Sequence, residues 1–246
     1  MKLPIYAINL DRSQSRWDDL QASAARQGLA LTRVSAVDGR TVAEAERADA
    51  SDAGFRRHAG RIMRPGEYGC YQSHLKALDL IVASGVPAAI IVEDDADFGP
   101  DFMARAEALL EACPQAEVIK LFNHRIRGFR KKAESRFGDQ IGRCIHGPQG
   151  SAACYLVTAS GAAKLARALR PMVLPFDVDL ERGWKTGAAT YTVHSDLISL
   201  GPLNIETEIG TREDYRQTRL PAWKRMPTHV FRAVDYARRM IYASLL

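Results

Sequence analysis

Residues 88–98 read AAIIVEDDADF, an apolar run that is followed at once by four acids, Glu93, Asp94, Asp95 and Asp97. A short apolar run of this kind predicts a buried β-strand. Carboxylates so close together repel one another and lose hydration near protein, so water, arginine side chains or a divalent metal must offset their charge. At the end of a buried strand, such a cluster suits Mg²⁺ or Mn²⁺ held beside substrate phosphates, and the alternative is a solvated acidic loop.

Other short apolar segments accompany this one and alternate with helix-like segments. Strands are predicted at residues 4–10, 29–39, 88–94, 116–122, 151–158 and 189–195. Helices are predicted at residues 11–28, 69–84, 102–113 and 160–169. This alternation predicts an α/β fold with a mostly parallel central sheet that is flanked by helices on both faces. Ligands of such sheets lie beyond the carboxyl ends of the strands.

Two segments do not fit the alternation of strands and helices. Residues 40–64 are polar and rich in alanine, which favours an excursion over the sheet. Residues 123–143 are basic and irregular, and we expect them to form an exposed flap.

The composition is that of an ordinary globular protein, with 46% apolar and 26% charged residues in a chain of 246. No apolar run approaches the roughly 18 residues of a membrane span, and the first residues lack the long apolar centre of a signal peptide. We therefore expect a cytoplasmic location. The cysteines have no metal-binding spacing and are expected to be reduced: Cys70, Cys113, Cys144 and Cys154.

The net charge of +5 is concentrated at the C-terminal end. Residues 216–246 carry seven Lys or Arg against one acid, so the rest of the chain sums to −1. We expect a domain at residues 1–210 and a basic tail at 211–246. Apolar residues recur in this tail at helical spacing: Val230, Val234, Ala237, Ile241 and Leu245. Such a helix either lies on the anionic inner face of the cytoplasmic membrane or packs on the domain.

Polar residues also follow the first two predicted strands, at the edge where this architecture places ligands. Asn9, Arg12 and Arg16 follow the first strand, and Asp38 and Gly39 follow the second. A helix start and a turn account for part of both patterns. The arginines are not explained by a helix start, so they are candidate ligand-binding residues.

Six motifs of the chain occur together in one known family. They are YAINLDRSQSR, VSAVDG, GEYGCYQSHLKAL, AIIVEDDADF, GSAACYLVTASGAAKL and LPFDVDLE, and they span residues 6 to 181. In this order and combination the chain resembles glycosyltransferase family 25, which includes bacterial lipooligosaccharide galactosyltransferases and animal collagen galactosyltransferases. The resemblance implies a GT-A-like nucleotide-sugar-binding fold and inverting transfer from a UDP-sugar, usually UDP-galactose, to a saccharide such as bacterial lipooligosaccharide or LPS.

The resemblance also implies a metal site for Mn²⁺ or Mg²⁺. The short acidic metal motif of GT-A enzymes matches Glu93 with Asp95, and Asp95 with Asp97 is the alternative pair. By analogy with the fold, His194 is a further candidate ligand.

Roles in donor binding and proton transfer are likewise implied for residues of the shared motifs. Asp177 or Asp179 would take the proton of the acceptor hydroxyl, with Asp177 preferred and a helix N-cap as the alternative. For two donor-site residues, alternatives stay open: Glu67 also suits a helix cap, and His74 a satisfied buried histidine. The donor-binding candidates are Asn9, Arg12, Arg16, Asp38, Gly39, Glu67, Ser73, His74 and Asp94.

Two other functions are compatible with parts of the sequence. A nucleotidyltransferase would normally need a glycine- and lysine-rich phosphate loop near the first strand, and neither GxGxxG nor GxxxxGK[ST] occurs. A non-catalytic basic protein that binds nucleic acid or membrane would use the C-terminal cations. The near-neutral remainder of the chain argues against a continuous phosphate-binding face, so no nucleic-acid partner is expected.

Overall fold

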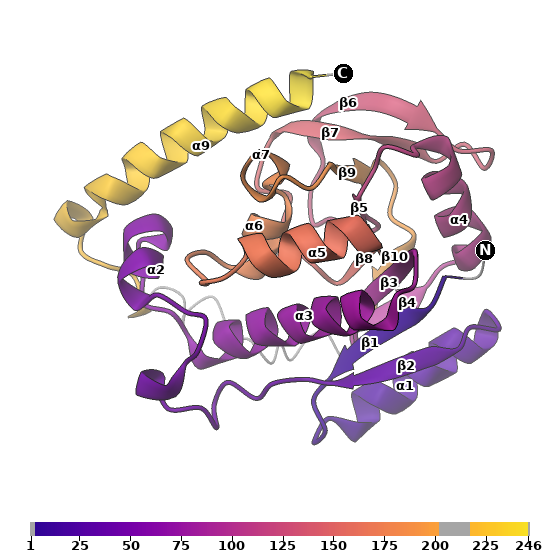
Figure 1. The fold of residues 1–246 in the computed structure, drawn as a ribbon, viewed down its shortest axis with the longest axis horizontal. Coiled ribbons are helices and arrows are strands. Elements are labelled where there is room, and N and C mark those ends of the chain that lie inside the picture. The colour runs from indigo at the N-terminus through magenta and orange to yellow at the C-terminus, as the bar shows by residue number, and fades with distance from the viewer. Residues whose placement is uncertain (1–2, 202–216, 246) are drawn as a thin grey trace.

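The computed structural model describes residues 3–201 and 217–245 (Figure 1). The strands are β1 Ile5–Asn9, β2 Leu31–Ser35, β3 Ala88–Glu93, β4 Ala96–Phe98, β5 Val118–Lys120, β6 Arg127–Glu134, β7 Gln140–His146, β8 Cys154–Thr158, β9 Thr190–Val193 and β10 Ile198–Leu200. The helices are α1 Gln14–Arg26, α2 Asp52–Ala59, α3 Pro65–Ser84, α4 Phe102–Ala112, α5 Ala159–Ala168, α6 Phe176–Leu180, α7 Gly183–Thr186 and α9 Met226–Ser244, with short 3-10 turns at Glu44–Glu46 and Ala222–Arg225.

Eight strands form the central sheet, in the order β2-β1-β3-β8-β5-β9-β7-β6. The pairing directions make β1, β2, β3, β5, β6 and β9 run one way, while β7 and β8 run the other. The predicted mostly parallel sheet is therefore confirmed, with two antiparallel insertions. A separate two-stranded ribbon joins β4 to β10.

The two faces of the sheet carry separate hydrophobic clusters because successive strand residues point to opposite sides. Ile90 and Val92 of β3 pack in the cluster that includes residues of α1 and α4. Ala89 and Ile91 of the same strand pack in the cluster formed with α3, α5 and α6. The continuous apolar run of β3 is thus explained by burial on both faces, and the predicted helical layers on both sides are confirmed (Figure 1).

The register brings the carboxyl ends of three neighbouring strands together. Ile8 of β1 pairs with Glu93 of β3, and Asn9 pairs with Ser35 of β2. The acids after β3, the polar residues after β1 and the turn after β2 therefore meet at one edge of the sheet.

Helix α3 begins four residues earlier than the pattern predicts, at Pro65. Proline suits the first position of a helix because the N–H that it lacks has no partner there. Glu67 closes this end by accepting a hydrogen bond from the backbone N–H of Arg64 at 3.1 Å. This capping places the first turn of α3 beside the loop that follows β2.

The prediction of an irregular flap at residues 123–143 is wrong. This segment forms β6 and most of β7, a hairpin that continues the central sheet through β9. The basic residues of β6 resemble a loop in sequence because β6 is an edge strand. Charged side chains on such a strand face solvent and discourage pairing with other chains. Arg143 of β7 is buried against the rings of Tyr191 and Tyr242, at 4.3 and 4.0 Å from their centroids.

The C-terminal helix α9 lies across α2, α7 and β7 (Figure 1). The boundary expected between residues 210 and 211 lies outside the described residues. Within the described ranges, no helix is both long enough and apolar enough to cross a membrane. All four cysteines are free thiols, as expected.

Candidate active site

A cavity of about 420 Å³ opens beyond the carboxyl ends of β1, β2 and β3. Its volume lies in the range of small-molecule sites. The other walls come from the first turns of α3, from residues 151–153 and from the start of α6. Among the residues expected at the site, those that line it are Asn9, Arg12, Arg16, Asp38, Gly39, Glu67, Ser73, His74, Glu93, Asp94, Asp95 and Asp177.

Asp94 is neutralised by groups of the first strand and helix. Arg16 donates to one of its oxygens at 2.7 Å, and Asn9 donates to the other at 2.7 Å. Asn9 also donates to the backbone carbonyl of Ser13 at 3.1 Å. The Asn9 amide therefore ties the end of β1 to α1 and to the acidic loop, and Arg16 supplies the charge that this loop needs.

Asp97 faces away from the cavity. Its carboxylate accepts a hydrogen bond from Ser23 at 2.6 Å and forms an ion pair with Arg26, both on α1. Asp97 lies in β4 on the side opposite Ala96 and Phe98, and the turn between β3 and β4 separates it from Asp95. Asp97 therefore drops out of the candidate metal set.

Asp95 is the acid whose charge is least compensated. Burial, and then the negative charge of Glu93, raise the pKa of Asp95 to about 7. Arg16 opposes this shift from 3.8 Å. The Oδ1 atom is buried, and none of the described residues hydrogen-bonds to it. A buried carboxylate oxygen without a partner, beside a second carboxylate, fits a hard divalent cation.

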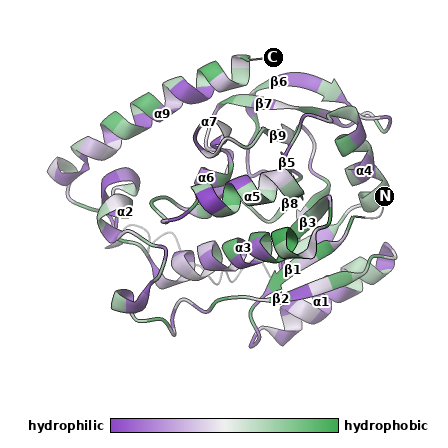
Figure 2. Cartoon of the chain, in the orientation of Figure 1, coloured by the Kyte–Doolittle hydropathy of each residue, from purple (hydrophilic) through white to green (hydrophobic). Residues whose placement is uncertain are grey.

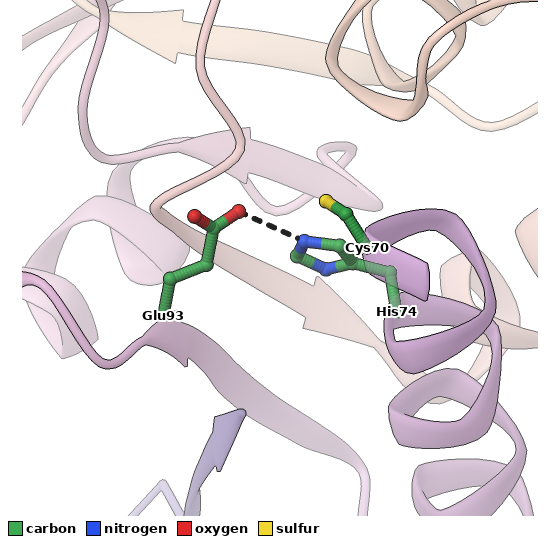
Figure 3. Close-up of side chains that lie close together, drawn as sticks. All are labelled: Cys70, His74 and Glu93. Carbon is green, nitrogen blue, oxygen red and sulfur yellow. Dashed lines mark hydrogen bonds and ion pairs between the residues drawn. The ribbon is translucent and has the colours of Figure 1, made fainter. Parts of the chain in front are cut away.

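Glu93, at the end of β3, is held by His74 of helix α3. The Nε2 atom of His74 is 3.0 Å from Oε1 of Glu93 (Figure 3). Its Nδ1 atom is 3.2 Å from the hydroxyl of Tyr155. The imidazole is fully buried and stacks on Phe176 with 4.1 Å between ring centroids. Both ring nitrogens are thus hydrogen-bonded within the protein. His74 is therefore a buried histidine whose polar atoms are satisfied by protein groups, although its ring also lines the cavity.

Cys70 adds a third possible metal ligand on the same side of the cavity. Its sulfur, His74 and Glu93 offer ligand atoms that all lie within 4.8 Å of one another (Figure 3). Burial, and then the charge of Glu93, raise the pKa of the Cys70 thiol well above its ordinary value. A thiol that stays protonated is a poor ligand, and Mg²⁺ and Mn²⁺ prefer oxygen. The oxygens of Glu93 and Asp95 suit these ions better.

The loop after β2 is fixed against α3 by close backbone contact. A Cβ on Gly69 would lie 2.4 Å from the carbonyl oxygen of Val37, and one on Gly39 would lie 1.9 Å from that of Pro65. Ser73 accepts a hydrogen bond from the N–H of Val37 at 2.8 Å. The glycines of the two motifs VDG and GEYGC are therefore required for contact between them.

Asp38 places a negatively charged carboxylate in the loop after β2. It forms ion pairs with Arg12 and Arg40. Burial would raise the pKa of Asp38, but hydrogen bonds from Arg40 and the charge of Arg12 outweigh it and lower the pKa. Glu67, on the other side of the loop, caps α3 and forms a two-oxygen ion pair with Arg61. The Asp38 carboxylate thus keeps the guanidinium groups of Arg12 and Arg40 at the cavity.

The two candidate bases have different surroundings. Asp177 lines the cavity at the start of α6, and burial, followed by the charge of Glu181, raises its pKa while Lys120 opposes the rise. Asp179 is fully buried, 2.7 Å from Arg182 and 3.3 Å from the hydroxyl of Tyr71. An acid that is enclosed in an ion pair away from the cavity cannot reach an acceptor hydroxyl, so Asp179 is removed as a base.

His194 is also removed as a site residue. It lies at the exposed end of β9, with its ring 4.9 Å from that of Phe129, and does not line the cavity. The analogy failed because the β6–β7 hairpin, which the sequence did not predict, takes up this end of β9.

Sequence reasoning missed a buried carboxylate that supports the wall at residues 149–153. Glu181 accepts hydrogen bonds from the N–H groups of Gln149 and Gly150 at 3.0 and 2.9 Å, and pairs with Lys120 at 3.0 Å. Burial would raise its pKa, but Lys120 and then Arg239 outweigh burial and lower it. The only sequence signal was a lysine within the apolar strand β5, which requires a buried partner.

Comparison with known proteins gives the same family as the motifs. The profile described as "Glycosyltransferase family 25 (LPS biosynthesis protein)" matches residues 2–180. "Inactive glycosyltransferase 25 family member 3" of Homo sapiens is 30% identical over 183 residues, 70% of this chain and 30% of that protein. "Procollagen galactosyltransferase 1" of Danio rerio is 29% identical over 116 residues, 44% of this chain and 18% of that protein. This chain therefore spans less than a third of the length of these relatives.

Among solved structures, apo mouse xyloside xylosyltransferase 1 is similar at 13% identity and a TM-score of 0.33, over 77% of this chain and 78% of that one. A likeness this low carries no argument about activity. The family profile, in contrast, matches well over half of the residues. The chain belongs to glycosyltransferase family 25.

Proposed function

We propose that this chain transfers a sugar, galactose, from a UDP-sugar to a hydroxyl of a saccharide acceptor, with inversion at the anomeric carbon. The observation that carries the proposal is Oδ1 of Asp95, which is buried beside Glu93 without a partner among the described residues, in a cavity that Arg12 and Arg16 also line. Such a site offers oxygens for a cation and guanidinium groups for a diphosphate. The family relationship supports a nucleotide-sugar donor, and the galactosyltransferase among the relatives supports galactose.

The proposed metal, Mn²⁺ or Mg²⁺, would be held by Glu93 and Asp95. When bound, it would stabilise the negative charge that develops on the departing UDP. Arg16 already balances Asp94, which leaves Asp95 as the acid that most needs a cation. His74 orients Glu93, as the outer partners of metal-binding carboxylates commonly do.

Asp177 is the proposed general base. The acceptor oxygen attacks the anomeric carbon from the face opposite UDP, and the bond from that carbon to the diphosphate oxygen breaks with its electron pair leaving on UDP. The hydroxyl proton passes to Asp177, whose raised pKa makes it a better proton acceptor than an ordinary aspartate. Arg12 and Arg40 also line the cavity, where they would meet donor phosphates.

The proposed acceptor is a lipid-anchored saccharide of the lipooligosaccharide or LPS type, in keeping with the description of the family. Such an acceptor is displayed at a membrane surface, so the proposal includes peripheral contact with the inner face of the cytoplasmic membrane.

A donor screen tests the proposal most economically. The purified chain would be offered a panel of UDP-sugars, with Mn²⁺ or with EDTA, while UDP release and UDP binding are measured. We expect UDP-galactose to be turned over only with the metal, and Asp95→Asn to abolish turnover while Asp97→Asn preserves it.

Either of two results would contradict the proposal. Turnover that is undiminished in EDTA would remove the metal from it. Binding of UDP without turnover of any sugar would remove the transfer and would align the chain with those relatives that are named inactive.

A further inference from the structure

The amphipathic helix α9 is held against the protein by polar contacts together with the packing of Phe231, Tyr242 and Ala243. Arg239, 5% exposed, pairs with the buried Glu181 at 2.9 Å. Asp235 pairs with Arg182 at 2.8 Å, and Thr228 donates to the backbone carbonyl of Arg57 at 2.8 Å. These contacts fix the rotation of the helix, so its other apolar side chains face outward.

The apolar side forms an outer stripe along the helix. Val230 is 61% exposed and Ile241 is 63% exposed. Exposed aliphatic side chains usually occur singly on a protein surface, whereas these belong to a continuous row. Residues spaced by three or four positions share one side of a helix, and about 19 residues extend for roughly 28 Å. The outer stripe consists of Met226, Val230, Val234, Ile241 and Leu245. Figure 2 shows hydrophobic and hydrophilic residues alternating along α9.

Two exposed cations lie beside the outer stripe, and no unpaired acid accompanies them among the described residues of this helix. Arg238 is exposed beside the stripe, and Lys224 is exposed just before the helix next to the exposed ring of Trp223. The one acid of α9, Asp235, is occupied by Arg182 on the inner side. The outer face therefore offers a long apolar strip, an aromatic ring and net positive charge.

We propose that this outer face of α9 binds the surface of an anionic lipid bilayer. Apolar side chains would enter the boundary between headgroups and acyl chains, while the cations and Trp223 meet the headgroups. A second copy of the chain fits less well, because a two-fold contact along the stripe would bring Arg238 and Lys224 of both copies together without acids between them. A described helix that is too polar to cross the bilayer but exposes one apolar side is suited to lie on it.

The contact would hold the candidate active site at a defined position over the membrane. Arg239 of α9 binds Glu181, and Glu181 binds the backbone of Gln149 and Gly150, which precede the cavity wall at residues 151–153. Helix and cavity wall are thus joined by two hydrogen-bonded steps. The bilayer contact itself rests on α9 and on Trp223 and Lys224 just before it, and does not depend on the transfer chemistry.

Vesicle flotation of the full chain, without nucleotide or sugar, tests the proposal. The probes are vesicles of phosphatidylcholine and vesicles of phosphatidylcholine mixed with phosphatidylglycerol. We expect the wild type to float only with the anionic vesicles and to be released by salt. We expect Val234→Asp with Ile241→Asp to weaken binding by roughly tenfold or more, and Lys224→Glu with Arg238→Glu to weaken it similarly.

The matched control carries the same change at two exposed apolar residues of α3. Leu80→Asp with Val82→Asp replaces side chains that are 41% and 45% exposed, and it should bind vesicles as the wild type does. Thermal unfolding confirms that each variant is folded. Equal binding by the wild type and the stripe variant, equal binding to neutral vesicles, or no vesicle binding at all would overturn the proposal. So would a wild-type dimer that the stripe variant dissociates.

Discussion

Nε2 of His74 lies 3.0 Å from Oε1 of Glu93, so a residue in the third turn of α3 fixes the carboxylate that ends β3. The histidine is itself fixed by the stack on Phe176 and by the hydroxyl of Tyr155. Helix α3, strand β8 and helix α6 thus set the direction of one acid. Its neighbour Asp95 faces the same cavity with an oxygen that none of the described residues binds.

His74→Ala should weaken Mn²⁺ binding by about 10- to 100-fold, the usual effect of losing a partner that orients a metal ligand. A titration of free Mn²⁺ by electron paramagnetic resonance measures this without any activity. Tyr155→Phe is the control, because it removes only the distant hydroxyl and should change affinity by no more than a few-fold. Unchanged affinity in His74→Ala would contradict the role assigned to the histidine.

Asp95 should make the metal-free protein less stable as the pH rises. Its pKa is about 7 in the folded state and about 3.9 when unfolded. The folded state therefore retains a proton that the unfolded state releases, and stability is lost between about pH 4 and about pH 7, on the order of 2–4 kcal/mol. In EDTA, Asp95→Asn should melt several degrees above the wild type at about pH 8, and the difference should shrink at about pH 5.

The control for this measurement is Asp97→Asn, because that carboxylate is paired with Arg26 on the outer side of the loop. Its melting temperature should show no such gain at high pH. A wild type that melts higher than Asp95→Asn at about pH 8 in EDTA would show that Asp95 is not an uncompensated buried charge.

Glu181→Gln should lower the free energy of unfolding by about 3–5 kcal/mol, because it leaves Lys120 and Arg239 buried without their counter-charge. Glu111→Gln, which breaks the exposed ion pair with Arg136, should cost less than about 1 kcal/mol. Urea unfolding of both variants provides the comparison. Equal losses would mean that the Glu181 cluster does not support the structure around it.

Gly69→Ala should reduce affinity for a UDP-sugar, since its Cβ would displace the loop at Val37 that the cavity shares. Gly28→Ala is the control, because Gly28 has φ +62° and nothing within 4 Å of an added Cβ. Both variants should lose about 1–2 kcal/mol of stability. Only Gly69→Ala should weaken binding of the UDP-sugar, which calorimetry measures.

Much of the sheet was predictable because its strands are apolar and short. The runs before Asn9 and before Glu93 end where the strands do, and helices α1, α4 and α5 match their patterns within a few residues. The β6–β7 hairpin was not predictable, because cationic edge residues resemble a loop in sequence. The start of α3 was misplaced, because the cap at Glu67 depends on its geometry with Arg64.

The candidate site was predictable where residues follow strand ends, because the register alone brings Asn9, Asp38 and Asp95 to one edge. The sequence did not predict which acid faces the cavity. Asp95 and Asp97 are only two residues apart, and the turn into β4 directs their side chains to different places. The side of α9 that packs against the domain was also not predictable from the sequence. Its apolar spacing was visible, but the ion pair of Arg239 with Glu181 needs the folded chain.

The sugar transfer that we propose for this cavity requires Asp177 to receive the proton of the acceptor hydroxyl. The most direct measurement is the rate of sugar transfer from UDP-galactose with Mn²⁺ for the wild type, Asp177→Asn and Asp97→Asn, together with the affinity of each for UDP. We expect Asp177→Asn to lower kcat by about 10²- to 10⁴-fold while UDP affinity is retained, and Asp97→Asn to stay near the wild type. Full activity in Asp177→Asn, or an equal loss in Asp97→Asn, would contradict the account.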